Sequence, residues 1–132
     1  MNNLLVIGAG GHANVVGEAA KLTGFYEEIS LIEINNKKDN KKSNVGFEVL
    51  CTFDQINKKN IIDKFSNVIV GIGDCSKRQK IMDKLKKMGF NIVSIVHPNA
   101  YVSSSAFIGE GSVVMANSVL QANCRLGKGC IV

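Results

Sequence analysis

The chain has 132 residues, 45% of them hydrophobic, with 13 glycines and one proline, so it has the size and composition of one folded domain or of two small units. Its net charge of +5 comes from 16 lysines and arginines against 11 aspartates and glutamates, but aromatic residues are scarce and tryptophan is absent, which argues against nucleic-acid binding. The apolar runs are far shorter than the roughly 18 residues that span a bilayer, so we expect no membrane segment.

Residues 1–96 show strands alternating with helices. Short apolar runs predict five strands, at 4–7, 29–33, 47–51, 68–72 and 90–96. Amphipathic stretches predict helices at 13–22 and 76–88 and a helical turn at 53–57, and the polar stretch 35–44 is expected to be a loop. Each crossover is long enough for a parallel connection, so the alternation predicts a doubly wound α/β domain with a parallel sheet.

The spacing of apolar residues predicts which side of each long helix is buried. In helix 13–22 the buried side should carry Val15, Val16, Ala19, Ala20 and Leu22, and Gly24 should end the helix. In helix 76–88 it should carry Ile81, Leu85 and Met88, with Gly89 just beyond the end.

From His97 and Pro98 onward the pattern changes to a period of six. Aliphatic residues recur without interruption at Val102, Ile108, Val114, Leu120, Leu126 and Val132. A small residue stands two places before each of them, at Ala100, Ala106, Ser112, Ser118, Cys124 and Cys130. This double register predicts a parallel β-helix in which the aliphatic side chains point inward and three hexads form one coil of 18 residues. Gly109 and Gly127, one coil apart, should lie one above the other at a turn.

The four cysteines form no C-x-x-C pair and have no interleaved histidines, so we expect no metal site and no redox pair. We expect Cys51, Cys75, Cys124 and Cys130 to be small buried side chains. The N-terminus runs directly into an apolar strand without the basic segment or cleavage site of a secretory signal, which predicts a cytoplasmic protein.

A glycine-rich loop follows the first strand. Residues 8–13 read GAGGHA, which fits the G-x-G-x-x-A pattern of dinucleotide-binding turns, and Glu33 stands at the end of the second strand. Such glycines let backbone N–H groups approach a pyrophosphate at the positive end of the following helix, although a tight turn without a ligand needs some of the same glycines. His12 at the helix start would donate to a phosphate or sugar oxygen, transfer a proton, or only cap and pack. A structural role is expected for His97.

Four features together resemble one protein family: the loop from Gly8 to His12, the segment from Gly73 to Arg78 after the fourth strand, the junction at residues 97–100, and the hexads. Over nearly its whole length the chain is similar to sugar acetyltransferases with an N-terminal Rossmann-like domain and a C-terminal left-handed β-helix. That family includes UDP-4-amino-sugar N-acetyltransferases of bacillosamine-type pathways and sialic acid O-acetyltransferases. The resemblance implies a Rossmann-like sugar- or nucleotide-binding domain over residues 1–96 and the first coils of a left-handed β-helix over residues 97–132.

The resemblance also implies a function, which is transfer of an acetyl group from acetyl-CoA to an amino or hydroxyl group of a nucleotide-linked or free sugar. The sugar or UDP-sugar would bind between the Rossmann-like domain and the β-helix, and acetyl-CoA would bind as co-substrate between neighbouring β-helices of a homotrimer, with no metal required. The implied substrate-binding residues are Gly8, Gly10, Gly11, His12, Glu33, Gly73, Asp74 and Arg78.

Two features depart from the family pattern. Family members often carry paired aspartates after the second strand, where this chain has Glu33 and Ile34. The family's catalytic histidine falls beyond the position that matches Val132, so we assign no catalytic residue and expect an N-terminal part of such an enzyme or a shortened product. The sequence leaves two alternatives open: a non-catalytic nucleotide-sugar-binding module, or an NAD-dependent oxidoreductase supported by the glycine pattern and Glu33.

Overall fold

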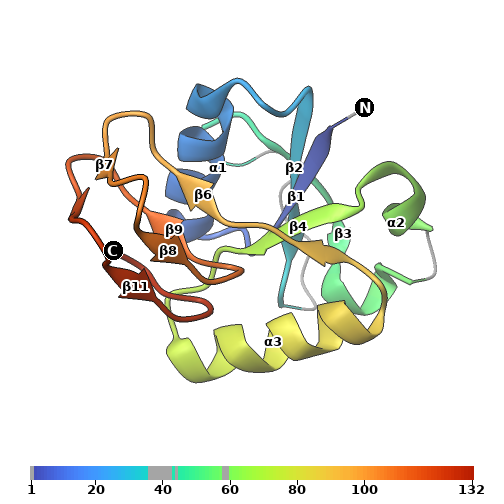
Figure 1. Ribbon diagram of the computed structural model, residues 1–132. Helices are drawn as coiled ribbons and strands as arrows, with labels where there is room; N and C mark the ends of the chain where they lie inside the picture. Colours follow the sequence, from blue (N-terminus) through green and yellow to red (C-terminus); the bar gives the residue numbers. More distant parts are fainter. Residues whose placement is uncertain (1, 36–42, 44, 58–59) are drawn as a thin grey trace.

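Five parallel strands form the central sheet of the N-terminal part (Figure 1). The structure, a computed structural model, describes residues 2–35, 43, 45–57 and 60–132, so most of the predicted loop at 35–44 lies outside the described residues. The strands are β1 (Asn3–Ile7), β2 (Glu28–Glu33), β3 (Glu48–Thr52), β4 (Asn67–Val70) and β5 (Asn91–Ile92). They lie in the order β3-β2-β1-β4-β5, which confirms the predicted parallel α/β sheet.

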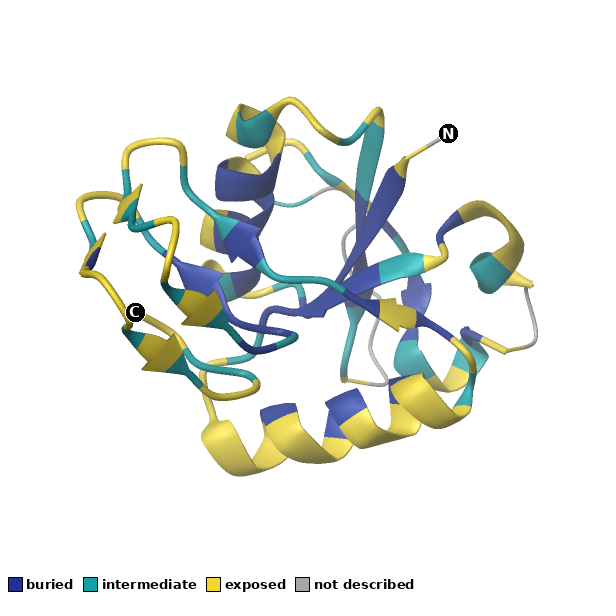
Figure 2. Cartoon of the chain, in the orientation of Figure 1, coloured by how far each residue is buried: buried dark blue, intermediate teal, exposed yellow. Residues whose placement is uncertain are grey.

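Helices cover both faces of this sheet. α1 (Gly11–Thr23) packs on one face and α3 (Cys75–Lys87) on the other, while η1 (Phe53–Gln55) and α2 (Ile61–Lys64) lie between β3 and β4 in the chain. Side chains alternate along β1, so Leu4 and Val6 join the core under α1, whereas Leu5 and Ile7 join the core under α3. Figure 2 shows the buried inner side and the exposed outer side of α3. The sequence pattern predicts all of these helical segments except α2.

The buried side of α1 is rotated about the helix axis relative to the predicted one. Three of the five predicted residues are buried, but Val15 is 44% exposed and Leu22 is 62% exposed, so their predicted burial is wrong. The buried stripe follows Ala13, Gly17 and Ala20, at the i, i+4, i+7 spacing of one helix face. These residues are small because the helix lies close to its neighbours, and the larger side chains beside them are left at the edge of the contact.

The predicted fifth strand, 90–96, is divided between two sheets, so its prediction as one strand is wrong. β5 pairs with β4, whereas β6 (Ile95–Val96) pairs with β9 (Val113–Val114) in the C-terminal part. Ile95 and Val113 also belong to the core under α1, so the two parts of the chain share one hydrophobic core. The apolar run over residues 90–96 is nearly continuous in the sequence. It is divided in the structure because its second half pairs with β9, a strand that comes later in the chain.

The C-terminal part is a β-helix in which each strand pairs with the strand 18 residues later. β7 (Tyr101–Val102) pairs in parallel with β10 (Val119–Leu120), and β8 (Phe107–Ile108) pairs in parallel with β11 (Arg125–Leu126). With the β6–β9 pair they form three two-stranded sheets, one for each hexad of a coil. The predicted coil length is therefore confirmed.

The hexad register correctly predicts the inside of the coils, except at the last residue. Five aliphatic positions are buried or half-buried, namely Val102, Ile108, Val114, Leu120 and Leu126. Val132 is 39% exposed. Their strand neighbours Tyr101, Phe107 and Val119 point outward, with exposed fractions of 59%, 51% and 56%. Inward aliphatic and outward exposed side chains thus alternate in these three strands, whereas in β9 both Val113 and Val114 are buried.

Turns of the β-helix repeat with the same period. Gly109 lies against Gly127, as predicted, because a Cβ atom at Gly109 would overlap the carbonyl group of Gly127. Four residues with a left-handed backbone follow one another at six-residue intervals: Gly111, Asn117, Asn123 and Gly129, with φ between 64° and 76°. Glycine and asparagine are the residues that adopt this conformation most readily, so each corner has a suitable residue.

One of the four cysteines follows the prediction of burial fully, and two follow it in part. Cys51 is buried, and Cys124 and Cys130 are half-buried in the small-residue positions of the coils. Cys75 is exposed, so its predicted burial is wrong. The reason is its place as the first residue of α3, where the chain leaves the sheet edge and faces solvent.

α3 also packs against one corner of the β-helix. This glycine corner comprises residues 109–111 and 127–129. Met82 lies so close to it that a Cβ atom at Gly111 would overlap the Met82 side chain. Lys86 of α3 forms an ion pair with Glu110, and its hydrogen bond to the carboxylate lowers the pKa of Glu110 below its usual value. Helix α3 is therefore joined to the coils by both packing and charge.

Candidate functional site

A pocket of about 320 Å³ opens at the carboxyl ends of β1, β2 and β4. Its lining comes from residues 8–12, 33–35 and 71–73 and from Lys77 of α3. Six of the eight implied substrate-binding residues line it, namely Gly8, Gly10, Gly11, His12, Glu33 and Gly73. The strand order reverses beside β1, and ligands of open α/β sheets bind at such a point.

Gly8 allows the loop after β1 to lie close to the end of β4. Its φ of 127° is unfavourable for residues with a side chain, and its N–H donates a 2.7 Å hydrogen bond to the carbonyl of Ile32. A Cβ atom at this position would lie only 2.8 Å from the carbonyl oxygen of Gly71. Glycine is therefore required here by the turn itself, whether or not a ligand binds.

Gly10 and Gly11 differ from Gly8 because their surroundings are open. Gly10 precedes α1 and Gly11 is the first residue of the helix, and a Cβ atom at either position would meet nothing within 4 Å. The first turn of α1 contains no acidic residue, so the positive end of the helix is not neutralised from within. These two glycines leave space for a ligand to approach the helix N-terminus.

His12 lies in the first turn of α1, and its Nε2 atom is buried without a hydrogen-bond partner among the described residues. Burial, and secondly the positive charge of Arg78, lower the pKa of His12 below its ordinary value of 6.5. The imidazole is therefore neutral near pH 7, with one nitrogen as a donor and the other as an acceptor. A buried nitrogen without a partner is costly, so the Nε2 atom of His12 is an unsatisfied polar group beside the pocket.

Glu33 is the last residue of β2 and brings the pocket a carboxylate. One carboxylate oxygen, Oε1, accepts a 3.1 Å hydrogen bond from the backbone N–H of Asn35. This bond holds the side chain at the turn after β2, beside the glycine loop. An oxygen acceptor at the end of the second strand is suited to hydroxyl groups of a ribose or another sugar.

Asp74 does not line the pocket, because its carboxylate caps α3. The Asp74 side chain accepts a 2.9 Å hydrogen bond from the backbone N–H of Lys77. Aspartate is a favoured residue at this position, since it satisfies a free N–H group of the first helical turn. Asp74 therefore begins the helix whose first turn carries two basic residues, Lys77 and Arg78.

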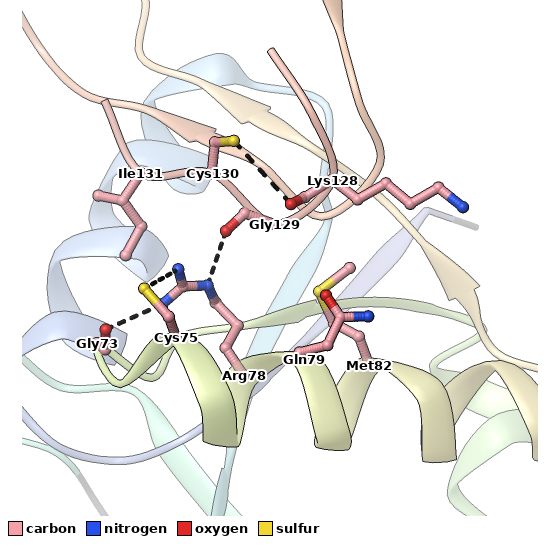
Figure 3. Close-up of a pocket in the computed structure, with 9 residues that line it drawn as sticks. All are labelled: Gly73, Cys75, Arg78, Gln79, Met82, Lys128, Gly129, Cys130 and Ile131. Carbon is pink, nitrogen blue, oxygen red and sulfur yellow. Dashed lines mark hydrogen bonds between the residues drawn. The ribbon is translucent and has the colours of Figure 1, made fainter.

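Arg78 does not line the pocket either, because its guanidinium group is buried and each of its three nitrogens donates to a group elsewhere (Figure 3). Nη1 donates to the carbonyls of Ile72 and Gly73, at 2.8 and 3.0 Å, and Nη2 donates to the sulfur of Cys75. Nε donates to the carbonyl of Gly129 in the glycine corner, at 2.8 Å. The side chain fixes the loop after β4 and ties it to the β-helix.

A second cavity, of about 560 Å³, lies between α3 and the glycine corner, and Figure 3 shows the side chains around it. Arg78 and Met82 line it from the helix, and Cys130 and Ile131 line it from the last coil. Gly73 lines both this cavity and the pocket at the sheet edge. The loop after β4 thus separates the two spaces.

Lys77 is a charged pocket residue that the sequence reasoning missed. The uncharged residues missed are Ala9, Ile34, Asn35, Gly71 and Ile72. Lys77 lies in the first turn of α3, three residues after the helix cap Asp74. It lines the same pocket as the glycine loop, although the two are far apart in the sequence. Its neighbour Arg78 matched the family pattern and was chosen instead. The signal that identifies Lys77 is its place in the first turn of a helix that starts at the same sheet edge.

His97 lies away from this site, in a hollow between α1 and the coils. Its Nδ1 accepts a 3.0 Å hydrogen bond from the backbone N–H of Asn99, which agrees with the structural role expected for it. Across the described residues, no group of three or more histidine, cysteine, aspartate or glutamate side chains is placed to hold a metal ion. In the same part of the chain, no helix has the length and apolar character needed to span a membrane.

Residues 3–85 match the domain family described as the PglD N-terminal domain, which is more than half of the chain. The chain belongs to the PglD N-terminal domain family. This result confirms the resemblance seen in the sequence, and with the parallel strand pairs that follow, the chain has a PglD-type N-terminal domain and a partial left-handed β-helix.

Relatives of this PglD-type chain are sugar acetyltransferases. It is 27% identical over 127 residues to a UDP-N-acetylbacillosamine N-acetyltransferase of Bacillus subtilis (strain 168), covering 88% of this chain and 52% of that protein. The acetyltransferase domain of PglB from Neisseria gonorrhoeae FA1090 superimposes with a TM-score of 0.90 at 38% identity, covering all of this chain and 62% of that domain. The same domain has been solved in complex with acetyl coenzyme A.

A third relative of the PglD-type chain comes from Caulobacter crescentus. A mutant of its perosamine N-acetyltransferase, in complex with CoA and GDP-perosamine, superimposes with a TM-score of 0.87 at 30% identity, covering 99% of this chain and 60% of that one. The chain thus spans about half the length of the curated relative and about 60% of the solved structures.

Proposed function

We propose that this chain is the nucleotide-sugar-binding part of an acetyl-CoA-dependent N-acetyltransferase. The single observation that supports this most strongly is the pocket at the switch point of the sheet, which combines an open glycine loop, a helix N-terminus and a carboxylate. The names of two relatives give amino sugars linked to UDP or GDP as their substrates or ligands. Both names specify N-acetyltransferases, so they support an amino acceptor, whereas sialic acid O-acetylation finds no support among these relatives.

Each pocket residue receives a role in this proposal. The N–H groups near Gly10 and Gly11 bind the pyrophosphate, because no side chain blocks the approach there. Neutral His12 hydrogen-bonds to a phosphate or sugar oxygen, and the carboxylate of Glu33 accepts from hydroxyl groups. Gly8 and Gly73 shape the walls of the pocket.

Asp74 and Arg78 support the site without touching the substrate. Asp74 starts α3, and Arg78 holds the carbonyls of Ile72 and Gly73 in place through its buried guanidinium group. The sequence resemblance placed both residues among those that face the substrate. Their hydrogen bonds to the backbone favour positioning roles instead.

Acetyl-CoA and a homotrimer complete the proposed enzyme. The outward residues Tyr101 and Val119 are stacked on one face of the β-helix and are more than half exposed, and Phe107 on a second face lies under the guanidinium of Arg125 at 4.8 Å. Exposed apolar side chains on flat faces are suited to contact with a neighbouring copy. Acetyl-CoA would bind as co-substrate along such a junction, and we assign no catalytic base to the described residues.

The test compares binding with turnover. Calorimetric titration of this chain with UDP- and GDP-linked 4-amino-sugars should give binding for one of them. Acetyl transfer from acetyl-CoA to the same sugar should then be detected with a version of the chain that carries further coils. Binding by neither nucleotide sugar, together with no transfer by the longer version, would reject the proposed function.

A non-catalytic nucleotide-sugar-binding module is the second candidate, because the glycine-loop pocket alone supports it. It predicts the same binding but no acetyl transfer by the longer version. An NAD-dependent oxidoreductase is not proposed, since the chain belongs to the PglD N-terminal domain family and β-helix coils follow its sheet.

A further inference from the structure

We propose that Lys77 supplies the positive charge that binds the diphosphate of the nucleotide-linked substrate. This inference rests on the proposed function, in which a nucleotide sugar occupies the glycine-loop pocket. Lys77 lies in the first turn of α3 and lines that pocket together with the glycines of the first turn of α1. A diphosphate carries about two negative charges, which backbone N–H groups alone do not neutralise.

Among the described residues, three basic side chains lie in or beside the glycine-loop pocket, and two of them are not available to the ligand. Arg78 is buried, and all three of its guanidinium nitrogens already donate to Ile72, Gly73, Cys75 and Gly129. His12 is kept neutral by burial and by the charge of Arg78, which lower its pKa. Lys77 remains, with an exposed side chain that forms no hydrogen bond or ion pair among the described residues.

The geometry of α3 explains why Lys77 and Arg78 have different surroundings. Consecutive residues of an α-helix point about 100° apart, since 3.6 residues complete a turn. Arg78 points to the glycine corner, so Lys77 points to the other side of the loop after β4, where the pocket lies. The cap formed by Asp74 fixes the backbone N–H of Lys77 at 2.9 Å and so anchors the base of this side chain.

Nearby carboxylates do not neutralise the charge of Lys77. Asp74 accepts from the backbone of Lys77, and no ion pair between the two side chains exists within the described structure. Glu33 borders the same pocket and accepts from the backbone of Asn35. The ammonium group therefore remains free to form a charge-assisted hydrogen bond with a phosphate oxygen.

The experiment measures binding of four probes by calorimetry at about 0.1 M salt: UDP, GDP, uridine and guanosine. Lys77→Ala should weaken binding of the diphosphate that the wild type prefers by about tenfold or more, the loss typical of a hydrogen bond between charged groups. Binding of the matching nucleoside should change by less than about twofold, and Lys77→Arg should restore most of the diphosphate affinity.

Lys84→Ala is the matched control. Lys84 is exposed, is seven residues later on the same side of α3, and its replacement changes the net charge by the same amount. It lies about 10 Å farther along the helix, a distance over which 0.1 M salt screens most of the interaction. Its replacement should therefore leave the affinity for the diphosphate unchanged.

The possible failures are distinguishable. If the wild type binds neither UDP nor GDP, the proposed function fails and the role of Lys77 fails with it. If the wild type binds a diphosphate and Lys77→Ala binds it equally well, or loses no more than Lys84→Ala, only the role of Lys77 is overturned. Because the Lys77 side chain is exposed, the thermal unfolding midpoint of Lys77→Ala should stay close to that of the wild type. An unchanged midpoint shows that the variant is folded.

Discussion

The Nε–H of Arg78 donates a 2.8 Å hydrogen bond to the carbonyl of Gly129, which joins the helix beside the pocket to a corner of the β-helix. The same guanidinium group holds the carbonyls of Ile72 and Gly73, which line the pocket. One buried side chain therefore fixes both the pocket wall and its position relative to the coils. In the proposed enzyme, this connection sets the position of the sugar relative to the acetyl-transfer machinery.

Replacement of Arg78 should destabilise the chain strongly. Arg78→Met removes the buried donor of the carbonyl groups of Ile72, Gly73 and Gly129 and should lower the free energy of unfolding by about 3 kcal/mol. Arg78→Lys should recover less than half of that loss, because one ammonium group cannot reach three carbonyls in different directions. Urea denaturation of both variants and of the exposed control Lys84→Ala measures this. A loss below about 0.5 kcal/mol for Arg78→Met would show that the hydrogen bonds contribute little.

The glycines of the first loop should separate folding from binding. Gly8→Ala should lower the free energy of unfolding by about 2 kcal/mol or more, because of its φ of 127° and the nearby carbonyl of Gly71. Gly11→Ala should change it by less than about 1 kcal/mol, since the position is helical and open. Gly11→Ala should nevertheless weaken nucleotide-sugar binding, because the methyl group occupies ligand space. Equal stability of the two variants would contradict this account of the loop.

Stacking of the coils predicts an asymmetric effect of two similar substitutions. Gly109→Ala should destabilise the chain severely, since its methyl group would overlap the carbonyl of Gly127 in the next coil. Gly127→Ala should be tolerated, because the nearest atom to an added Cβ is the sulfur of Cys130, at 4.0 Å. Thermal unfolding of the two variants side by side tests this. A larger loss for Gly127→Ala would contradict the 18-residue stacking.

The pH dependence of stability should report the buried state of His12. Its folded pKa lies below 6.5, so between the two values the unfolded chain binds a proton that the folded chain does not. The free energy of unfolding should therefore fall as the pH is lowered from about 7.5 through 6.5, and the contribution should be constant above that range. His12→Asn should lose less stability over the same interval, measured by urea denaturation at several pH values. An identical slope in both proteins would mean that His12 is not buried as described.

The fold could be predicted from the sequence because two periodic patterns describe it almost completely. Alternating strands and helices predicted the sheet, and the hexads predicted the inward column of residues such as Val114 and Leu120. The boundary between the two patterns was harder to predict from the sequence. Ile95 and Val96 follow directly after an apolar strand, and their true partners, Val113 and Val114, are visible only once the chain is folded.

Side-chain direction was the part of the site that sequence could not provide. The pattern marked the loops that meet at the pocket, but it did not show that Arg78 turns toward Gly129 while Lys77 remains free. Consecutive residues of a helix belong to the same sequence motif, but their side chains point in different directions. Val15 and Leu22 illustrate the same limit, because apolar character did not reveal which side of α1 is buried.

A crystal structure of the chain with the nucleotide-linked amino sugar that it binds would test the central claim most directly. We predict the diphosphate at the sheet edge, with phosphate oxygens about 3 Å from the N–H groups of Gly10 or Gly11 and from the ammonium group of Lys77. Occupation of the cavity beside Arg78 and Met82 instead, with the glycine-loop pocket filled only by solvent, would contradict the account.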